Sequence, residues 1–305
     1  MMPLKFPLAA ILAIAICLPV HAADDIAAKL AGCNQAISEG DASKALALAE
    51  QVLSQQANNR DALMCKGRAY GGTGKTKEAL EALRAGEKLS QKPLDHIIAL
   101  TLIGNVHKSA GESDAALQAY QQSLELSRSE RNVRFERINL NLIGETQASS
   151  QQLDKALESF LAGSKLAAND NERADNYARI ADVYNKQGKH DQAIEYQVKA
   201  VLMQERSGDA DSFAGATLEL GRMYGDAKDY VNAEKYTNKI IKLGKDQGGP
   251  YWEAMGYYYL AKSKAKQGLS AEARKLLEEA QQISDELGAR ALSEEIKLTM
   301  GSLAK

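Results

Sequence analysis

The sequence repeats itself at intervals of 34 to 40 residues, and this period constrains the fold more than any other feature. Each copy contains a turn-like segment whose sixth residue is an alanine. The segments are GDASKAL (40–46), GKTKEAL (74–80), GESDAAL (111–117), QQLDKAL (151–157), GKHDQAI (188–194), KDYVNAE (228–234) and GLSAEAR (268–274). Their alanines, 34, 37, 40, 37, 40 and 40 residues apart, are Ala45, Ala79, Ala116, Ala156, Ala193, Ala233 and Ala273. Such a period indicates stacked supersecondary units.

A second small residue stands seven positions before each of these segments, as Cys33, Gly67, Gly104, Gly144, Ala181, Gly221 and Ala261. In the third to seventh copies an apolar residue directly precedes it: Ile103, Ile143, Ile180, Leu220 and Leu260. Several copies carry an aromatic residue or histidine three positions after it, namely Tyr70, His107, Tyr184 and Tyr224. The helical offsets predict one helix before each turn and a second helix after it.

This pattern resembles the tetratricopeptide repeat, which runs W-x2-L-G-x2-Y and then A-x3-F in a helix–turn–helix of about 34 residues. The sixth copy matches most clearly, with LGRMY (220–224) followed by Ala233. The fourth copy supplies Ile143-Gly144 (143–144), followed by Ala156 and Phe160. The resemblance covers nearly all of the chain after residue 22. Most copies lack the first aromatic residue of the pattern, and almost all lack its closing proline.

The resemblance implies an all-α fold, a right-handed α-solenoid of about seven helix–turn–helix repeats over residues 23–288. Residues 289–305 are expected to form a C-terminal capping helix. One helical hairpin cannot bury its apolar face alone, so neighbouring hairpins stack and share a continuous core. The small residues let two helix backbones approach closely. Glycine in the turn suits the left-handed conformation that ends a helix.

The first 22 residues read as a secretory signal peptide rather than as part of the fold. Lys5 precedes an apolar run from Pro7 to Val20, and Val20-His21-Ala22 is a small-residue cleavage pattern. The run is too short for a comfortable membrane span, and Ile16 before Cys17 does not fit a lipoprotein site. We expect cleavage after Ala22 and export, most simply to a bacterial periplasm, with secretion as the alternative.

Composition agrees with a helical protein and disfavours two classes of function. Alanine, leucine, glutamate, lysine and glutamine are all well represented, and these residues favour helices. The formal net charge is −2 without a basic stripe, which argues against nucleic-acid binding. No stretch after residue 22 is apolar enough to span a bilayer, so we expect no membrane span.

The stretch GGTGKT (71–76) looks at first like a phosphate-binding P-loop. That motif requires G-x-x-x-x-G-K-[ST] after a buried strand, but Ala69 stands where the first glycine is needed. The residues before it follow the helical repeat, with Leu63, Gly67 and Tyr70 at the expected offsets. The stretch is therefore predicted to be the turn of the second repeat.

No motif for catalysis or metal binding emerges from the remaining residues. His96, His107 and His190 share no metal-ligand spacing with one another or with the cysteines, and His107 stands where other copies have tyrosine. G-x-S-x-G and H-E-x-x-H are absent. We therefore expect no enzymatic activity, no metal and no cofactor.

Cys33 and Cys65 remain after the expected cleavage and lie on the first helices of adjacent repeats. Export to an oxidising compartment permits a disulfide between them. Closing the 32-residue span would stabilise the fold by about 3–4 kcal/mol in the loop-entropy model. The alternative is two buried free thiols that fill small-residue positions.

The resemblance places partner binding in a concave groove lined by the exposed sides of the first helices. Amides there can bond a peptide backbone, and arginines and lysines can bind carboxylates. The implied groove residues are Met64, Arg68, Thr101, Asn105, Lys108, Asn141, Glu145, Asp182, Asn185, Leu218, Arg222, Tyr258 and Lys262. In YWEAMGYYYL (251–260), Trp252 and Tyr259 are possible aromatic anchors, because interface hot spots are enriched in such residues. A solvated polar face or simple core packing would also explain these residues.

The sequence therefore predicts a non-enzymatic scaffold of the bacterial cell envelope that binds a protein or peptide segment in its groove. The alternative is a self-associating, homo-oligomeric platform. A ligand sensor or an enzyme is the third possibility. No residue identifies the partner.

Overall fold

The computed structural model describes residues 20–303, and over these residues the protein consists of fifteen α-helices and no β-strand. The predicted all-α helical repeat fold is confirmed. The chain divides into two compact units, which meet in sequence between Glu112 and Ser113. The third repeat is thereby divided, with its first helix in unit 1 and its second helix in unit 2.

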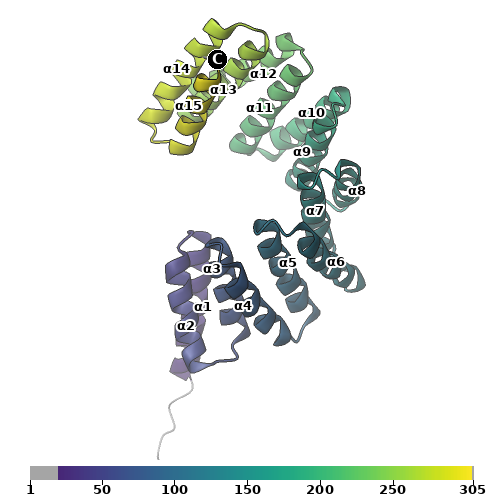
Figure 1. The fold of residues 1–305 in the computed structure, drawn as a ribbon, viewed down its shortest axis with the longest axis vertical. Coiled ribbons are helices and arrows are strands. Elements are labelled where there is room, and N and C mark those ends of the chain that lie inside the picture. Colours follow the sequence, from purple (N-terminus) through teal and green to yellow (C-terminus); the bar gives the residue numbers. More distant parts are fainter. Residues whose placement is uncertain (1–19, 304–305) are drawn as a thin grey trace, which may run out of the picture. The chain divides into compact units, whose positions relative to one another are not determined.

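Unit 1 contains two complete helical hairpins and one further helix (Figure 1). Each helix packs on the next, and the first helices α1, α3 and α5 also contact one another in sequence order. The helices are α1 (Val20–Ser38), α2 (Ala42–Gln55), α3 (Arg60–Gly72), α4 (Thr76–Lys88) and α5 (Pro93–Ser109).

Unit 2 follows the same plan and ends in a single helix. The first helices α9, α11, α13 and α15 contact one another in order, and each also packs on its neighbours in the chain. The helices are α6 (Ser113–Ser129), α7 (Val133–Ser149), α8 (Leu153–Ser164), α9 (Asp170–Lys186), α10 (His190–Ser207), α11 (Ala210–Asp226), α12 (Tyr230–Gln247), α13 (Pro250–Lys266), α14 (Ser270–Glu286) and α15 (Arg290–Leu303). None of the helices described here combines the length and apolar character needed to cross a bilayer.

The turn between the two helices of a repeat uses one backbone conformation throughout. Left-handed glycines with φ between 72° and 81° open the turn segment in five copies: Gly40, Gly74, Gly111, Gly188 and Gly268. Gln151 (φ 59°) and Lys228 (φ 62°) hold the same position in the two copies that lack glycine. The stretch 71–76 thus contains the end of α3, a turn and the first residue of α4, and the prediction that it is the turn of the second repeat is confirmed.

The seven repeated alanines form the centre of the hairpins, because every one of them is 0% exposed. The apolar residues Ile103, Ile143, Ile180, Leu220 and Leu260 are also buried. Within each unit, the period in the sequence therefore marks the contact between the two helices of a repeat.

The small residues before each turn allow a helix–helix approach too close for a larger side chain. A Cβ added to Gly67 on α3 would lie 2.5 Å from Leu83 Cγ on α4, and one on Gly144 would lie 2.6 Å from Phe160 Cε1. Contacts this short do not occur between real Cβ atoms. Leucine or phenylalanine from the second helix thus occupies the space that glycine leaves on the first.

The last helix covers the end of unit 2. Leu292 and Ile296 of α15 are buried in one cluster with Tyr258 and Ala261 of α13 and Leu277 of α14. The outer side of α15 faces solvent, with Leu298 77% exposed. The expected signal peptide lies for the most part outside the described residues, since α1 begins at Val20.

A disulfide joins Cys33 on α1 to Cys65 on α3, with their Cα atoms 6.4 Å apart. Both residues are buried, and both belong to the cluster that holds Ala45 and Ala69. The disulfide therefore links the first helices of two adjacent repeats.

The close approach at Gly67 predicts a loss of stability when a methyl group is added there. Gly67→Ala should lower the free energy of unfolding by about 1–3 kcal/mol, because Leu83 must leave its position. Gly72→Ala, at the end of the same helix, meets no atom within 4 Å and should be neutral or mildly stabilising. Urea denaturation followed by circular dichroism measures both variants. Equal stability of the two would contradict the close packing.

Candidate functional site

Helix geometry separates the predicted groove residues into a buried set and a half-exposed set. The buried set stands three residues before the small residue of its copy. The small residue marks the helix face that packs against the second helix of the repeat. At about 100° per residue, an offset of three residues places a side chain only about 60° from that face. The buried residues, with their exposed fractions, are Met64 (6%), Thr101 (7%), Asn141 (6%), Leu218 (1%) and Tyr258 (3%). The prediction that these five line an open groove is therefore corrected.

Two of the corrected residues, Asn141 and Tyr258, hydrogen-bond to the next repeat, whereas Thr101 donates to Ile97 O on its own helix. Asn141 on α7 accepts a 2.6 Å hydrogen bond from Asn176 Nδ2 on α9. Tyr258 on α13 donates a 2.8 Å hydrogen bond to Glu295 on α15, and burial raises its pKa to about 12. These side chains join adjacent repeats, which explains polar residues at a buried position.

The remaining groove residues keep part of their surface open to solvent. All of them are half-buried: Arg68, Asn105, Lys108, Glu145, Asp182, Asn185, Arg222 and Lys262. Arg68, Asn105 and Lys108 lie on α3 and α5 of unit 1, and the others lie on the first helices of unit 2. The exposed face of the first helices thus exists in each unit, with fewer residues than the sequence predicted.

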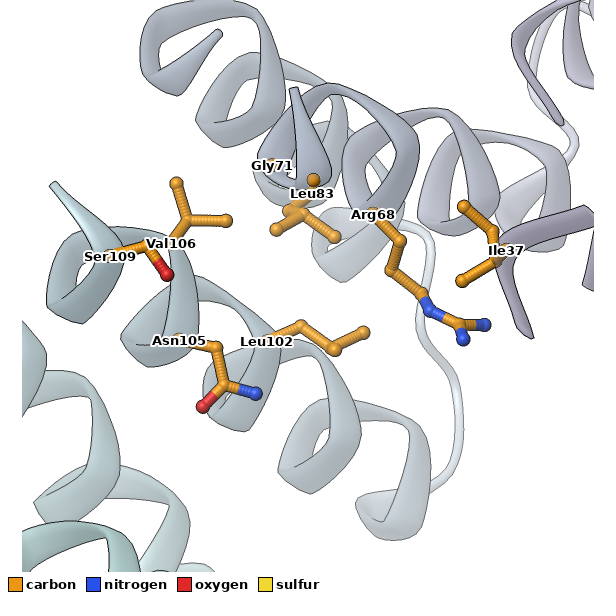
Figure 2. A pocket seen from close by; sticks show the side chains of 9 residues that line it. Ile37, Arg68, Gly71, Leu83, Leu102, Asn105, Val106 and Ser109 are labelled. Atoms are coloured by element: carbon orange, nitrogen blue, oxygen red, sulfur yellow. The ribbon is translucent and has the colours of Figure 1, made fainter. Parts of the chain in front are cut away.

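Unit 1 contains an open, mainly apolar pocket of about 260 Å³ on this face. Its lining residues come from α1, α3, α4 and α5: Ile37, Arg68, Gly71, Gly72, Leu83, Leu102, Asn105, Val106 and Ser109. Figure 2 shows Leu102 pointing from α5 into the space between the helices, and Arg68 extending along its edge toward Ile37. Gly72 would place a Cβ in open space. A cavity of about 150 Å³ can hold benzene, so this pocket has room for a large apolar side chain.

Arg68 is the positively charged group of this pocket. Its Nη1 donates a 2.8 Å hydrogen bond to the neutral Asn34 Oδ1 on α1. Among residues 20–303, no carboxylate forms an ion pair with it. A half-buried guanidinium that is hydrogen-bonded to an amide can still bind a carboxylate in a bidentate ion pair.

The corresponding face of unit 2 is filled by ion pairs between neighbouring first helices. Arg179 on α9 pairs with Glu145 on α7 and, at 3.2 Å, with Asp175 on its own helix. Asp182 pairs with Lys186 at 2.7 Å. The predicted groove residues Glu145 and Asp182 are therefore already paired with neighbouring side chains, and a ligand would have to exchange these partners.

Asp226 is the centre of the densest polar network on this face. Its carboxylate accepts hydrogen bonds from Arg222 Nη1 at 2.7 Å, from Asn185 Nδ2 at 2.8 Å and from Lys266 Nζ. Burial alone would raise the pKa of Asp226, but the hydrogen bonds from Lys266 and Asn185, with the charges of Lys266 and Arg222, hold it below its ordinary value. The carboxylate thus stays ionised and joins α9, α11 and α13.

The predicted aromatic anchors are engaged within unit 2. Trp252 Nε1 donates a 2.6 Å hydrogen bond to Asp211 on α11. Tyr259 donates a 2.7 Å hydrogen bond to Glu219 on α11, and burial together with this carboxylate raises its pKa well above the ordinary value. Both rings lie between α11 and α13 and keep only part of their surface exposed.

The sequence analysis did not include, among the groove residues, the positions two residues before and five residues after the small residue of a copy. Leu102 and Gly72 in unit 1, and Asp226 and Lys266 in unit 2, hold these positions and line pockets. At 100° per residue these offsets fall about 140–160° from the buried face. Helical periodicity alone would therefore have identified them.

No group of three histidine, cysteine or carboxylate residues suited to a metal occurs in the part of the chain that is described. The histidines instead make single local contacts. His96 Nδ1 lies 2.8 Å from Glu87, His107 Nδ1 2.5 Å from Glu112, and His190 Nδ1 3.0 Å from Asn185.

Comparisons with known proteins agree with this geometry. Two family models described as tetratricopeptide repeat match residues 99–134 and 174–206. A comparison with curated proteins finds no match.

Solved structures with a similar fold share little sequence with this chain. One is the STAND protein PH0952 from Pyrococcus horikoshii, which carries a tetratricopeptide repeat sensor. The similarity covers 91% of this chain and 44% of that protein, with a TM-score of 0.71 and 17% sequence identity. Apo RapI is similar over 92% of this chain and 82% of its own (TM-score 0.68, 14% identity). A Rap protein complexed with competence and sporulation factor is similar over 92% of this chain and 98% of its own (TM-score 0.52, 14% identity). At these identities the likeness shows the fold alone.

The Asp226 network predicts a specific loss of stability in acid. Because the pKa of Asp226 is lowered in the folded protein, its contribution is present above the unfolded pKa of about 4 and is lost as pH falls through the folded value. Asp226→Asn should lower the free energy of unfolding by about 1–3 kcal/mol at pH 7. The difference from the wild type should shrink as the pH falls through the lowered pKa of Asp226 in the folded protein.

Urea titrations at several pH values measure this difference. Asp246→Asn, at an exposed position on α12, is the matched control and should follow the wild type throughout. An Asp226→Asn protein as stable as the wild type at pH 7 would refute the structural role of the network.

Proposed function

The chain belongs to the tetratricopeptide-repeat superfamily, and we propose that it is an exported, non-enzymatic scaffold that binds a segment of a partner protein. The open face of its first helices is the binding surface in this proposal. The apolar pocket of unit 1 receives a large side chain of the partner. Arg68 at the pocket edge binds a polar or acidic group beside it.

The pocket beside Arg68 is the observation that carries the proposal. Its walls are Ile37, Leu83, Leu102 and Val106, and none of the side chains described in unit 1 fills it. The few side chains that contribute most of the binding energy in protein interfaces, often Trp or Tyr, are usually buried in pockets of the partner. The two glycines at the end of α3 keep the backbone accessible there.

Two further observations support binding rather than catalysis. Tetratricopeptide repeats, which match two segments here, are generally non-catalytic modules for protein interaction. One protein of similar fold was solved in complex with competence and sporulation factor. The half-exposed amides and charges on the first helices suit an extended or helical partner segment.

Export rests on the signal-like first 22 residues, and the disulfide supports it. Cys33 and Cys65 are joined in the structure, and disulfides persist in oxidising compartments such as the bacterial periplasm. We place the protein in the bacterial cell envelope for these two reasons.

Export predicts a defined processed form. The protein recovered from the periplasmic fraction of an expressing bacterium should begin at Ala23 and carry no free thiol. N-terminal sequencing and mass spectrometry under non-reducing conditions measure both properties. An unprocessed chain found only in the cytoplasm would reject the proposed location while leaving partner binding untouched.

Filling the pocket of unit 1 should abolish partner capture. Gly72→Leu places an isobutyl group where a Cβ meets nothing within 4 Å. It should reduce recovery of the partner at least about tenfold, equivalent to about 1.4 kcal/mol of binding free energy. The measurement is a crosslinking pull-down from the envelope fraction, quantified by mass spectrometry.

The matched control is Gly301→Leu, the same substitution at an open glycine on α15. Circular dichroism verifies that both variants fold. A partner recovered equally by wild type, Gly72→Leu and Gly301→Leu would overturn the pocket as binding site. Recovery of the protein itself as the sole product would favour the homo-oligomeric platform, which light scattering would then measure.

A further inference from the structure

The Cys33–Cys65 disulfide lies one helical turn from two residues that line the pocket of unit 1. Ile37 follows Cys33 by four residues on α1, and Arg68 follows Cys65 by three residues on α3. Residues at these spacings lie on the same side of a helix. The disulfide therefore joins the sides of α1 and α3 from which Ile37 and Arg68 reach the pocket.

Helix α1 contributes one wall of this pocket and holds its charged group. Ile37 comes from α1, and the other lining residues come from α3, α4 and α5. Asn34 on α1 accepts the 2.8 Å hydrogen bond from Arg68 Nη1, and Figure 2 shows Arg68 extending toward Ile37. If α1 moved away, the pocket would lose this wall and Arg68 would lose this acceptor.

The side chains buried around the disulfide are small. The cluster that contains both cysteines otherwise buries four alanines, Ala36, Ala45, Ala49 and Ala69. Because the free energy of burial scales with the apolar area removed from water, alanines contribute little to holding α1 in place. Ile26 packs with Val52 in a separate cluster, closer to the start of α1. The end of α1 beside the pocket therefore depends mainly on the disulfide.

From these observations we infer that the pocket of unit 1 is complete only in the oxidised chain, because the disulfide holds the α1 wall in place. The two thiols lose two protons and two electrons when the bond forms, and a disulfide oxidant such as oxidised glutathione accepts them and becomes two thiols. Cys33 and Cys65 are 0% and 2% exposed, so a reductant does not reach the bond in the folded chain. The disulfide is thus a permanent crosslink made during folding.

The link from this crosslink to partner binding rests on the proposed function, in which the pocket of unit 1 is the binding site. Disulfides form in oxidising compartments and are rare in reducing ones. The chain therefore acquires its complete binding site only where the surroundings are oxidising, and the same chain kept reduced has an incomplete one.

Hydrogen–deuterium exchange of the free full chain tests the crosslink without a partner. Wild-type protein is unfolded and refolded either with oxidised glutathione or with dithiothreitol under nitrogen. Amides in residues 34–38 and 68–72 should exchange at least about tenfold faster in the reduced chain, because local opening of α1 no longer has to break a covalent bond. Residues 277–283 on α14, in unit 2, should exchange equally in both samples.

A double variant, Cys33→Ala with Cys65→Ala, separates the crosslink from the refolding conditions. Alanine suits the position of Cys33, since Ala181 and Ala261 hold it in other copies. The double variant should exchange like the reduced wild type and should not respond to oxidised glutathione. Ile240→Ala, at a fully buried position of unit 2, is the control. It lowers stability by forming a cavity and should keep the exchange of the oxidised wild type at residues 34–38 and 68–72.

Capture of the partner from the envelope fraction is the second measurement. The double variant should recover at least about fivefold less partner than the oxidised wild type, because apparent affinity falls with the fraction of chains that are competent to bind. Faster exchange of α1 with undiminished capture would retain the crosslink's role and would reject the pocket of unit 1 as the binding site.

Three results would overturn the inference whatever the capture shows. The first is equal exchange of residues 34–38 and 68–72 in the oxidised, reduced and double-variant proteins. The second is faster exchange of these residues in Ile240→Ala as well, which would assign the effect to a general loss of stability. The third is faster exchange of residues 277–283 in the reduced chain, which would show that the disulfide holds the whole fold and not the pocket wall.

Discussion

The close approach of the two helices of a repeat within each unit is the constraint on which the rest of the structure depends. Gly67 and Gly144 leave space that Leu83 and Phe160 fill, and the fully buried alanines on the second helices complete the contact. A larger side chain at either place would separate the helices. Because the contact recurs every 34 to 40 residues, each hairpin presents the same apolar surface to the next one, and stacking follows.

Stacking also determines which surface remains available for function. The first helices use one face for the small-residue contact and the adjacent face for neighbouring repeats, as Asn141 with Asn176 and Tyr258 with Glu295 show. The opposite face is left open in each unit. In unit 1 that face contains an apolar pocket beside Arg68, and in unit 2 it is covered by the network around Asp226. The two units therefore offer different chemistry on equivalent helices.

Much of this could be predicted from the sequence, because the repeat positions report backbone contacts directly. The buried alanines and the left-handed turn glycines agree with the pattern, and Gln151 and Lys228 keep the turn without glycine. The candidate site was less accessible. The burial of Leu218 follows from its place three residues before Gly221, about 60° from the buried face, but the groove prediction did not apply this offset. Pairing of Arg222 with Glu219 and Asp226, in contrast, depends on side-chain geometry across α11.

Hydrogen–deuterium exchange of the partner-bound protein tests the central claim most directly. The complex captured by the wild-type chain is compared with the free protein, peptide by peptide, by mass spectrometry. The account predicts added protection at residues 68–72 and 102–109, where α3 and α5 line the pocket of unit 1. Protection confined to the second helices, or to α15, with no change in those two segments, would contradict it.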